Sequence, residues 1–389
     1  MQKMDKIFLE ILDIYTRVLV VLKKIFSRKE KNMIKKNIIK WLLVCFIISF
    51  LVVNCSKDTT GPDDELKKIG WVIGDPSDGY SSIFYTNDGG QNWVRQGDSL
   101  SIPDVSLSDI KAVDSLHAWI VGPQADGYAT ILKTSDGGST WERIENRGGI
   151  PNKELLGLHV CSQDELWAVG FDNTIIYTNN GGNTWTSKAD TTFGPYQLAS
   201  IAVVGDKIWV VGNHPSLGGT IIHSSDYGNT WSHQAQGEFL SERGMIEISA
   251  ASENCLWAVG HGRTILHTSN GGLTWEIQKT DIEPEWDANG VCAISENIAW
   301  DVEDVGYIYY TTNGGENWEQ QTVPYYANAY FLYRISPLNK DIAWIVGPCA
   351  STPFDGIILY TEDAGQNWVE QDYGSDVPVW DVSFVGAHH

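Results

Sequence analysis

The sequence has little that would indicate a metal site, a disulfide framework or a membrane bundle. It holds 6 Cys and 4 Met in 389 residues, and no two cysteines stand at a C-x-x-C or metal-ligand spacing. One long apolar run occurs, Ile38–Val53, and a single run excludes a polytopic membrane protein. Hydrophobic residues make up 42% and charged residues 20% of the chain, which is a globular composition and not that of a disordered protein.

Motifs of known chemistry are also missing. No P-loop, zinc motif, nucleophile elbow or glycine-rich dinucleotide fingerprint occurs. The acidic residues include no ordered series of calcium ligands. We therefore expect no catalytic residue, no metal and no cofactor. Four cysteines, Cys161, Cys255, Cys292 and Cys349, are expected to be isolated buried thiols, although their spacing leaves disulfide pairing open.

Basic residues are scarce beyond the first part of the chain. Beyond residue 54 the sequence has 16 Lys and Arg against 45 Asp and Glu. A surface this acidic repels a phosphate backbone, so binding to nucleic acid is excluded. Excess negative charge also keeps a protein soluble and apart from its neighbours.

The front of the chain predicts export. Lys35 and Lys36 precede the apolar run and Lys40 lies near its start; the run is short for a membrane span and is followed by Asn54-Cys55. This resembles a bacterial lipoprotein signal over residues 33–54, and the resemblance implies a lipid on Cys55, a polar tether over residues 55–65 and an envelope location. Ser56 resembles the residue that sends lipoproteins to the outer membrane. A plain signal anchor is the alternative, and residues 1–32 are expected to precede the true start at Met33.

Tryptophan is plentiful, with 17 residues, and most of it is repeated. Seven octets end in Trp: 86–93, 134–141, 178–185, 224–231, 268–275, 311–318 and 361–368. A second Trp recurs upstream in W-x-V-G segments, at positions 71, 119, 167, 209, 257, 300 and 344. The period of about 43 to 50 residues is that of a propeller blade. Each repeat reads as four short strands, for example 109–113, 117–121, 130–134 and 140–144.

The octets resemble the Asp-box, or bacterial neuraminidase repeat, S/T-x-D-x-G-x-x-W. The third residue accepts hydrogen bonds within the turn, and Asn in three copies fits a turn role better than an acid–base or metal role. We therefore interpret these positions as structural: Asp88, Trp93, Asp136, Trp141, Asn180, Trp185, Asp226, Trp231, Asn270, Trp275, Asn313, Trp318, Asp363 and Trp368.

The complete repeat, over residues 66–386, resembles the photosystem II assembly-factor-like propellers. The resemblance implies an all-β, seven-bladed propeller of four-stranded antiparallel blades over residues 66–389, which binds a partner without catalysis. Family members bind through a basic patch, which does not transfer to so acidic a chain. We expect a monomer, with another envelope or secreted protein as partner, or a glycan.

The two ends of the repeat region complement each other. Repeat one begins at its second strand, Ile69–Ile73, and the chain ends in a strand-like segment, Val379–Val385. We expect this last strand to complete the first blade and close the ring, which removes the exposed strand edges. Truncation of the chain is the alternative.

The four strands of each repeat are named A to D in chain order. Function is expected on the propeller face that carries the B–C and D–A connections, which we call the loop face. Long B–C loops are predicted at 75–81, 123–129, 213–219 and 348–356. The candidate binding residues are Phe193, Tyr196, Phe239, Arg243, Arg263, Trp286, Tyr325, Tyr326, Tyr330 and Arg334. Blade six replaces W-x-V-G with Trp300-Asp-Val-Glu-Asp304, which is expected to be a solvated acidic loop, with paired glycosidase carboxylates as the alternative.

Three functions are compatible with these features. The favoured one is a lipid-anchored interaction scaffold. A glycan-binding module is the second, and a sialidase-like hydrolase is the third. Sialidase chemistry requires three converging Arg, for which only Arg243, Arg263 and Arg334 are suitably placed.

Overall fold

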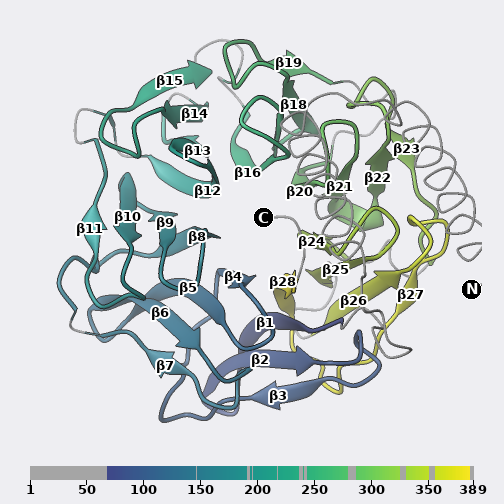
Figure 1. Ribbon diagram of the computed structural model, residues 1–389. Coiled ribbons are helices and arrows are strands. Elements are labelled where there is room, and N and C mark those ends of the chain that lie inside the picture. The colour runs from purple at the N-terminus through teal and green to yellow at the C-terminus, as the bar shows by residue number, and fades with distance from the viewer. Residues whose placement is uncertain are drawn as a thin grey trace, which may run out of the picture. The chain divides into compact units, whose positions relative to one another are not determined.

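The computed structural model describes residues 68–385, except residues 146, 191–192, 195, 217, 236–239, 241–242, 279–285, 325–329 and 350–354. The expected extension, signal, tether and lipidated Cys55 lie outside the described residues. The described part forms seven four-stranded antiparallel sheets around a central axis (Figure 1). The predicted seven-bladed propeller is confirmed.

Blades are numbered in chain order, and each runs from an innermost strand A to an outermost strand D (Figure 1). Blade one contains β28 (Val379–Phe384), β1 (Gly70–Ser77), β2 (Tyr80–Thr86) and β3 (Val94–Gln96). Blade two contains β4 (Asp109–Ala112), β5 (Ala118–Ala125), β6 (Tyr128–Thr134) and β7 (Glu142–Arg143). Blade three contains β8 (Leu155–Val160), β9 (Leu166–Gly170), β10 (Thr174–Thr178) and β11 (Thr186–Ser187).

The remaining blades follow the same order. Blade four contains β12 (Gln197–Val204), β13 (Lys207–His214), β14 (Gly218–Ser224) and β15 (Ser232–Ala235). Blade five contains β16 (Met245–Ala250), β17 (Leu256–Gly260), β18 (Thr264–Thr268) and β19 (Glu276–Ile277). Blade six contains β20 (Ala288–Ala293), β21 (Ala299–Glu303), the 3₁₀ turn η2 (Asp304–Gly306), β22 (Ile308–Thr311) and β23 (Glu319–Gln320). Blade seven contains β24 (Arg334–Pro337), β25 (Ala343–Pro348), β26 (Gly356–Thr361) and β27 (Val369–Glu370).

The core lies between the blades. The Trp of each W-x-V-G segment sits on strand B and is at most 2% exposed, and it packs with apolar residues of the next sheet. Large flat rings fill the wedge between two sheets with few rotatable bonds. The octet residues Trp141, Trp185, Trp231 and Trp368 are also buried. The tryptophan excess is therefore mostly core.

Each octet forms the turn between strands C and D. In the second blade, Thr134 Oγ1 accepts the backbone N–H of Gly138 at 2.8 Å and donates to Asp136 Oδ1 at 2.9 Å. Asp136 in turn accepts the backbone N–H of Thr140 at 2.9 Å. Asn180 makes the same acceptor bond to the backbone N–H of Thr184 at 3.0 Å. Asn thus replaces Asp without loss of the turn's backbone bonds.

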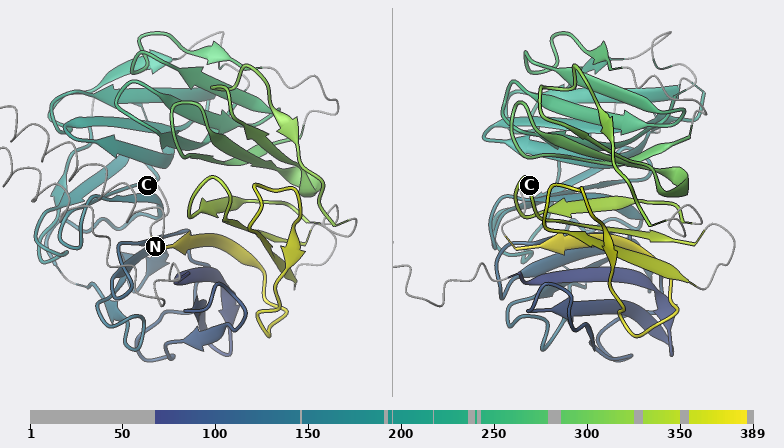
Figure 2. Two further views of the ribbon diagram at one scale, coloured as in Figure 1. Left: turned by 45° about the vertical axis from the view of Figure 1, so that its right-hand side comes forward. Right: turned by 90° about the vertical axis from the view of Figure 1, so that its right-hand side faces the viewer.

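Closure by the last strand is confirmed. β28 pairs antiparallel with β1, with Gly70 opposite Phe384 and Val72 opposite Val382. In Figure 2 the yellow C-terminal strand lies beside the dark N-terminal strands of blade one. The ring of Phe384 also stacks on Trp344 of blade seven, with centroids 3.5 Å apart. The last strand therefore completes the sheet of blade one and also packs against blade seven.

The predicted long B–C loops are wrong in blades one and two. β1 and β2 continue to a two-residue turn at Asp78-Gly79, and β5 and β6 continue to Asp126-Gly127. All four turn residues have positive φ, between 54° and 88°. This conformation matches the twist of a hairpin, so the strands extend and the loop disappears. The connection in blade four, between His214 and Gly218, is short as well.

No helix in the described ranges is long and apolar enough to cross a membrane.

Candidate functional site

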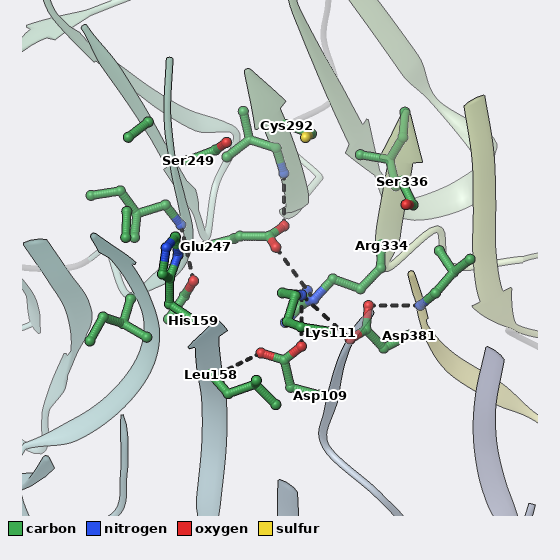
Figure 3. A pocket seen from close by; sticks show the side chains of 18 of the residues that line it. Asp109, Lys111, Leu158, His159, Glu247, Ser249, Cys292, Arg334, Ser336 and Asp381 are labelled. Carbon is green, nitrogen blue, oxygen red and sulfur yellow. Dashed lines mark hydrogen bonds and ion pairs between the residues drawn. The ribbon is translucent and has the colours of Figure 1, made fainter. Parts of the chain in front are cut away.

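The innermost strands enclose a narrow channel with a polar lining. Alternate residues of these strands face it, and its cavity measures about 60 Å³. Its ionisable lining residues are labelled in Figure 3: Asp109, Lys111, His159, Glu247, Cys292, Arg334 and Asp381. A polar space of this size is large enough to hold water.

The cations of the channel are bound by its carboxylates. Lys111 Nζ lies 2.7 Å from Asp109 and 3.8 Å from Asp381. Arg334 Nε lies 3.7 Å from Glu247, and its Nη1 donates to the backbone carbonyl of Asn289 at 2.8 Å. Because each cation is already bound, the cluster is not arranged to hold an anionic ligand.

The same carboxylates join neighbouring blades. Asp381 accepts the backbone N–H of Ile110 at 2.8 Å, and Asp109 accepts that of Leu158 at 2.7 Å. Glu247 accepts the N–H of Val291 at 2.8 Å. The inner edge of strand A carries N–H groups that no fifth strand can pair. These side chains satisfy them and fix the blades around the axis.

Burial sets the protonation of this cluster. Burial opposes ionisation of Asp109, but Lys111 beside it holds the pKa of Asp109 below its usual value. Burial raises the pKa of Asp381 well above its usual value, and the Asp109 carboxylate adds to the effect. Burial and Lys111 lower the pKa of His159 to about 4, so this imidazole is neutral at physiological pH. Asp381 thus keeps its proton beside the ionised Asp109, which removes the repulsion between these two carboxyl groups.

The carboxylates of blade six do not form a solvated loop, and that expectation is wrong. Asp301 and Glu303 on β21 are both 0% exposed and point into the space between blades five and six. Arg263, from the B–C turn of blade five, lies 2.6 Å from Glu303. Buried charge requires such a partner. Substrate has no access to this carboxyl pair, which argues against a glycosidase role.

Tyrosines complete this buried cluster. Tyr309 is paired with Asp301 across β21 and β22 and is fully buried. The Arg263 guanidinium lies 5.2 Å from the ring centroid of Tyr309 and 5.6 Å from that of Tyr307. Other blades carry Gly at the position of Glu303, and they carry Ala, Val or Ile at that of Asp301. Two departures from the repeat, Asp301 and Glu303, therefore lie in one inter-blade space with Arg263.

The described members of the expected binding set differ in their exposure. Tyr196 is buried, and Phe193 is partly buried against His233, with ring centroids 4.5 Å apart. Tyr330 is partly exposed and donates to Asp355 at 2.9 Å, and Trp286 is partly exposed. Phe239, Tyr325 and Tyr326 lie outside the described residues. Trp286 and Tyr330 therefore stay candidates.

The three arginines do not converge. Arg243 donates to Thr264 at 3.3 Å, Arg263 binds Glu303, and Arg334 lines the channel instead of the loop face. A sialidase site requires three guanidinium groups around one carboxylate, and these three have different partners. Within the described ranges, no group of three His, Cys, Asp or Glu could hold a metal ion.

Cysteine placement agrees only in part with expectation. Cys255 and Cys292 are buried, whereas Cys161 is exposed and Cys349 is intermediate. The expectation of a buried thiol is therefore wrong for Cys161. Burial raises the pKa of Cys255 to about 12, which leaves it a poor nucleophile at neutral pH.

The sequence matches two family models. Residues 150–241 match photosynthesis system II assembly factor YCF48, and residues 309–320 match the BNR/Asp-box repeat. The resemblance expected from the octets is confirmed. No curated protein matches the sequence.

Solved structures share the fold at low identity. YCF48 bound to D1 peptide is 19% identical with a TM-score of 0.54, over 72% of this chain and 93% of that one. YCF48 from Cyanidioschyzon merolae is 17% identical with a TM-score of 0.58, over 76% and 91%. An ancestral GH74 enzyme is 14% identical with a TM-score of 0.53, over 80% and 39%. Both assembly factors and a hydrolase thus share this scaffold, and fold alone does not decide between them.

Proposed function

We propose that this chain, an Asp-box propeller similar to the photosystem II assembly factor family, is a non-enzymatic scaffold that holds another protein. The observation that carries the proposal is the burial of its paired carboxyls. Asp301 and Glu303 are enclosed between two blades, and Asp109 and Asp381 bind backbone groups of the next strand. Carboxyls that hold the ring together do not act on a substrate.

Similarity to the assembly factors supports protein binding. One solved relative in fold is a YCF48 bound to a peptide. A rigid ring with hairpins raised on one face presents contact residues at low entropic cost. The partner is a protein of the cell envelope, and the chain is a monomer.

Anchoring by lipid is part of the proposal. It is supported by the basic residues, apolar run and Cys55 at the front of the sequence. Radiolabelled palmitate should enter the full chain and not the Cys55→Ser variant. Equal labelling of both chains would refute the anchor and leave the scaffold role intact.

Affinity capture of the full chain from its native envelope tests the scaffold role. The expected result is one partner recovered in proportion to the bait, together with no turnover of a fluorogenic sialoside. Turnover would overturn the proposal. Binding to a glycan array without a protein partner would show the glycan-binding module instead.

A further inference from the structure

The channel mouth on the loop face departs from the repeat in two neighbouring blades. The innermost strands align at one position, which is a carboxylate, glycine, serine or arginine: Asp381, Asp109, Gly157, Ser200, Glu247, Gly290 and Arg334 in blades one to seven. The residue just before this position lies at the channel mouth. In blades two to six these residues are Ser108, Leu156, Ala199, Ile246 and Asn289. In blades seven and one they are Tyr333 and Trp380. Trp380 is one of two mature-chain tryptophans outside the repeat positions.

A bulge places Trp380 at this mouth. Ile73 pairs with Asp381 and Gly74 with Val379, so Trp380 has no partner in the ladder. The same bulge occurs on the innermost strand of blades three to six, so it is a feature of the repeat that turns this position toward the mouth. Trp380 Nε1 donates to Asp75 Oδ1 at 2.7 Å, and Ser106 donates to the same oxygen at 2.6 Å. The indole is therefore held in one orientation.

Tyr333 meets this indole at an angle. The two ring centroids are 5.5 Å apart and the planes are inclined by 61°. Both side chains are partly exposed. Two rings at this angle form a corner and not a flat platform.

One carboxylate, Asp75, contacts the corner, and two more act on it electrostatically. Burial raises the pKa of the Tyr333 phenol, and the carboxylates of Asp304 and Asp287 raise it further. Asp287 accepts His261 Nδ1 at 2.7 Å, and Asp304 accepts Asn289 Nδ2 at 2.8 Å. The guanidinium of Arg334 donates to the carbonyls of Asn289 and Tyr333. Asp287 and Asp304 are therefore held in place by hydrogen bonds, whereas the Arg334 cation opposes their effect on the Tyr333 phenol.

Most cations in the described part are paired with carboxylates, whereas Lys188 and Arg243 donate to uncharged oxygens. The pairs are Lys68–Glu362, Arg95–Asp78, Lys111–Asp109, Lys133–Glu142, Arg143–Asp126, Arg147–Glu142, Lys153–Asp172, Lys207–Glu253, Arg263–Glu303, Arg334–Glu247 and Lys340–Asp341. The surplus charge of the chain is negative. A partner that complements it contributes positive charge.

We propose that the corner formed by Trp380 and Tyr333 receives a Lys or Arg side chain of the partner protein. The proposal rests on the scaffold role and names the partner's chemistry at one site. Aromatic faces attract an ammonium or guanidinium group, and nearby carboxylates strengthen the attraction. A sugar ring would stack on one flat aromatic face, which a corner beside carboxylates does not offer.

Fluorine NMR of the full chain with 5-fluorotryptophan tests this. The Trp380 signal is assigned by its loss in Trp380→Phe. The probes are N-acetyl-lysine methylamide, its neutral analogue N-acetyl-norleucine methylamide, and methyl glucoside. The lysine probe should shift the Trp380 signal saturably, and the other two should not. Tyr333→Leu should weaken lysine binding at least fivefold, and it should fold because Leu156 occupies this place in blade three.

The matched control is Asp206→Asn, which removes one exposed carboxylate from the turn between β12 and β13 on the opposite face. It should leave lysine binding unchanged. An equal loss in this control, or unchanged binding in Tyr333→Leu, would overturn the proposal, and a saturable shift by methyl glucoside alone would indicate a glycan site. If the native chain captures its partner but does not bind the lysine probe, the corner is refuted and the scaffold role is not. If the native chain binds the lysine probe but captures no partner, the scaffold role is refuted and the corner is not.

Discussion

At the residue scale, Asp301 and Glu303 share a space with one guanidinium. Burial and Glu303 raise the pKa of Asp301 well above its usual value. Burial raises the pKa of Glu303 to about 7 against the opposing effect of Arg263. Asp301 and Glu303 lie beside a single cation, so burial of both carboxyl groups is favourable only while one of them holds a proton. The cluster therefore titrates near neutral pH.

This titration should be visible in stability. A group whose pKa is raised by folding stabilises the fold at low pH, and the contribution is lost as pH rises through the folded-state pKa. Between pH 5 and 8 the free energy of unfolding of the native chain should fall by about 1–2 kcal/mol more than that of Asp301→Asn. Denaturant unfolding across this range measures it. Parallel profiles for the two chains would contradict the shared proton.

The octet threonines make a second prediction at this scale. Thr134→Val keeps the side-chain shape but removes the acceptor of the buried Gly138 N–H. An unsatisfied buried donor should cost about 1–3 kcal/mol of unfolding free energy. Asn180→Asp, which keeps the turn's acceptor, should change it by less than about 0.5 kcal/mol. Thermal and denaturant unfolding of the two variants decides, and similar losses in both would refute the turn role.

At the element scale, the hairpins of blades one and two depend on left-handed turn residues. Gly79 has φ of 84° and no atom within 4 Å of an added Cβ, so Gly79→Ala introduces backbone strain without a clash. It should destabilise the chain by about 1 kcal/mol. Gly148, which has open space and no positive φ, is the matched site. Gly148→Ala should be neutral or stabilising, and the same loss at both positions would contradict the turn assignment.

The hairpins also show what sequence reading misses. Strand cores such as Trp119–Val121 are continuous apolar runs and were predictable. Asp78-Gly79 and Asp126-Gly127 are a known hairpin signal, but polar residues around them favoured a loop. The extended strands are held by contacts outside the blade, such as Ser81 N–H to the carbonyl of Pro103 at 2.9 Å. Local patterning carries no information on such contacts.

At the scale of the whole molecule, the repeat predicted the ring and its closure but not its interior chemistry. Glu303 is buried because Arg263 reaches it from the neighbouring blade. Asp381 lines the channel because seven strands converge there. Both depend on residues far away in the chain, so a single strand's sequence leaves them open. The sequence signal that could have indicated a polar channel was the presence of polar residues at alternate positions of the innermost strands.

Closure makes a prediction for the whole ring. Deletion of residues 377–389 removes β28, which pairs with β1 and stacks Phe384 on Trp344. Blade one then exposes a strand edge and the apolar residues packed against Val379 and Val382. The truncated chain should unfold cooperatively at a temperature where the full chain is folded. Unchanged melting by circular dichroism would contradict closure.

The central claim, that the loop face holds a protein partner, is tested most directly by paired photo-crosslinking in the envelope. A benzophenone amino acid replaces Gln124 on the loop-face strand β5, or Gln163 on the Asp-box face, and both positions are exposed. We predict one discrete cross-linked partner from position 124 and none from position 163. Equal cross-linking at both positions, or none at position 124, would contradict it.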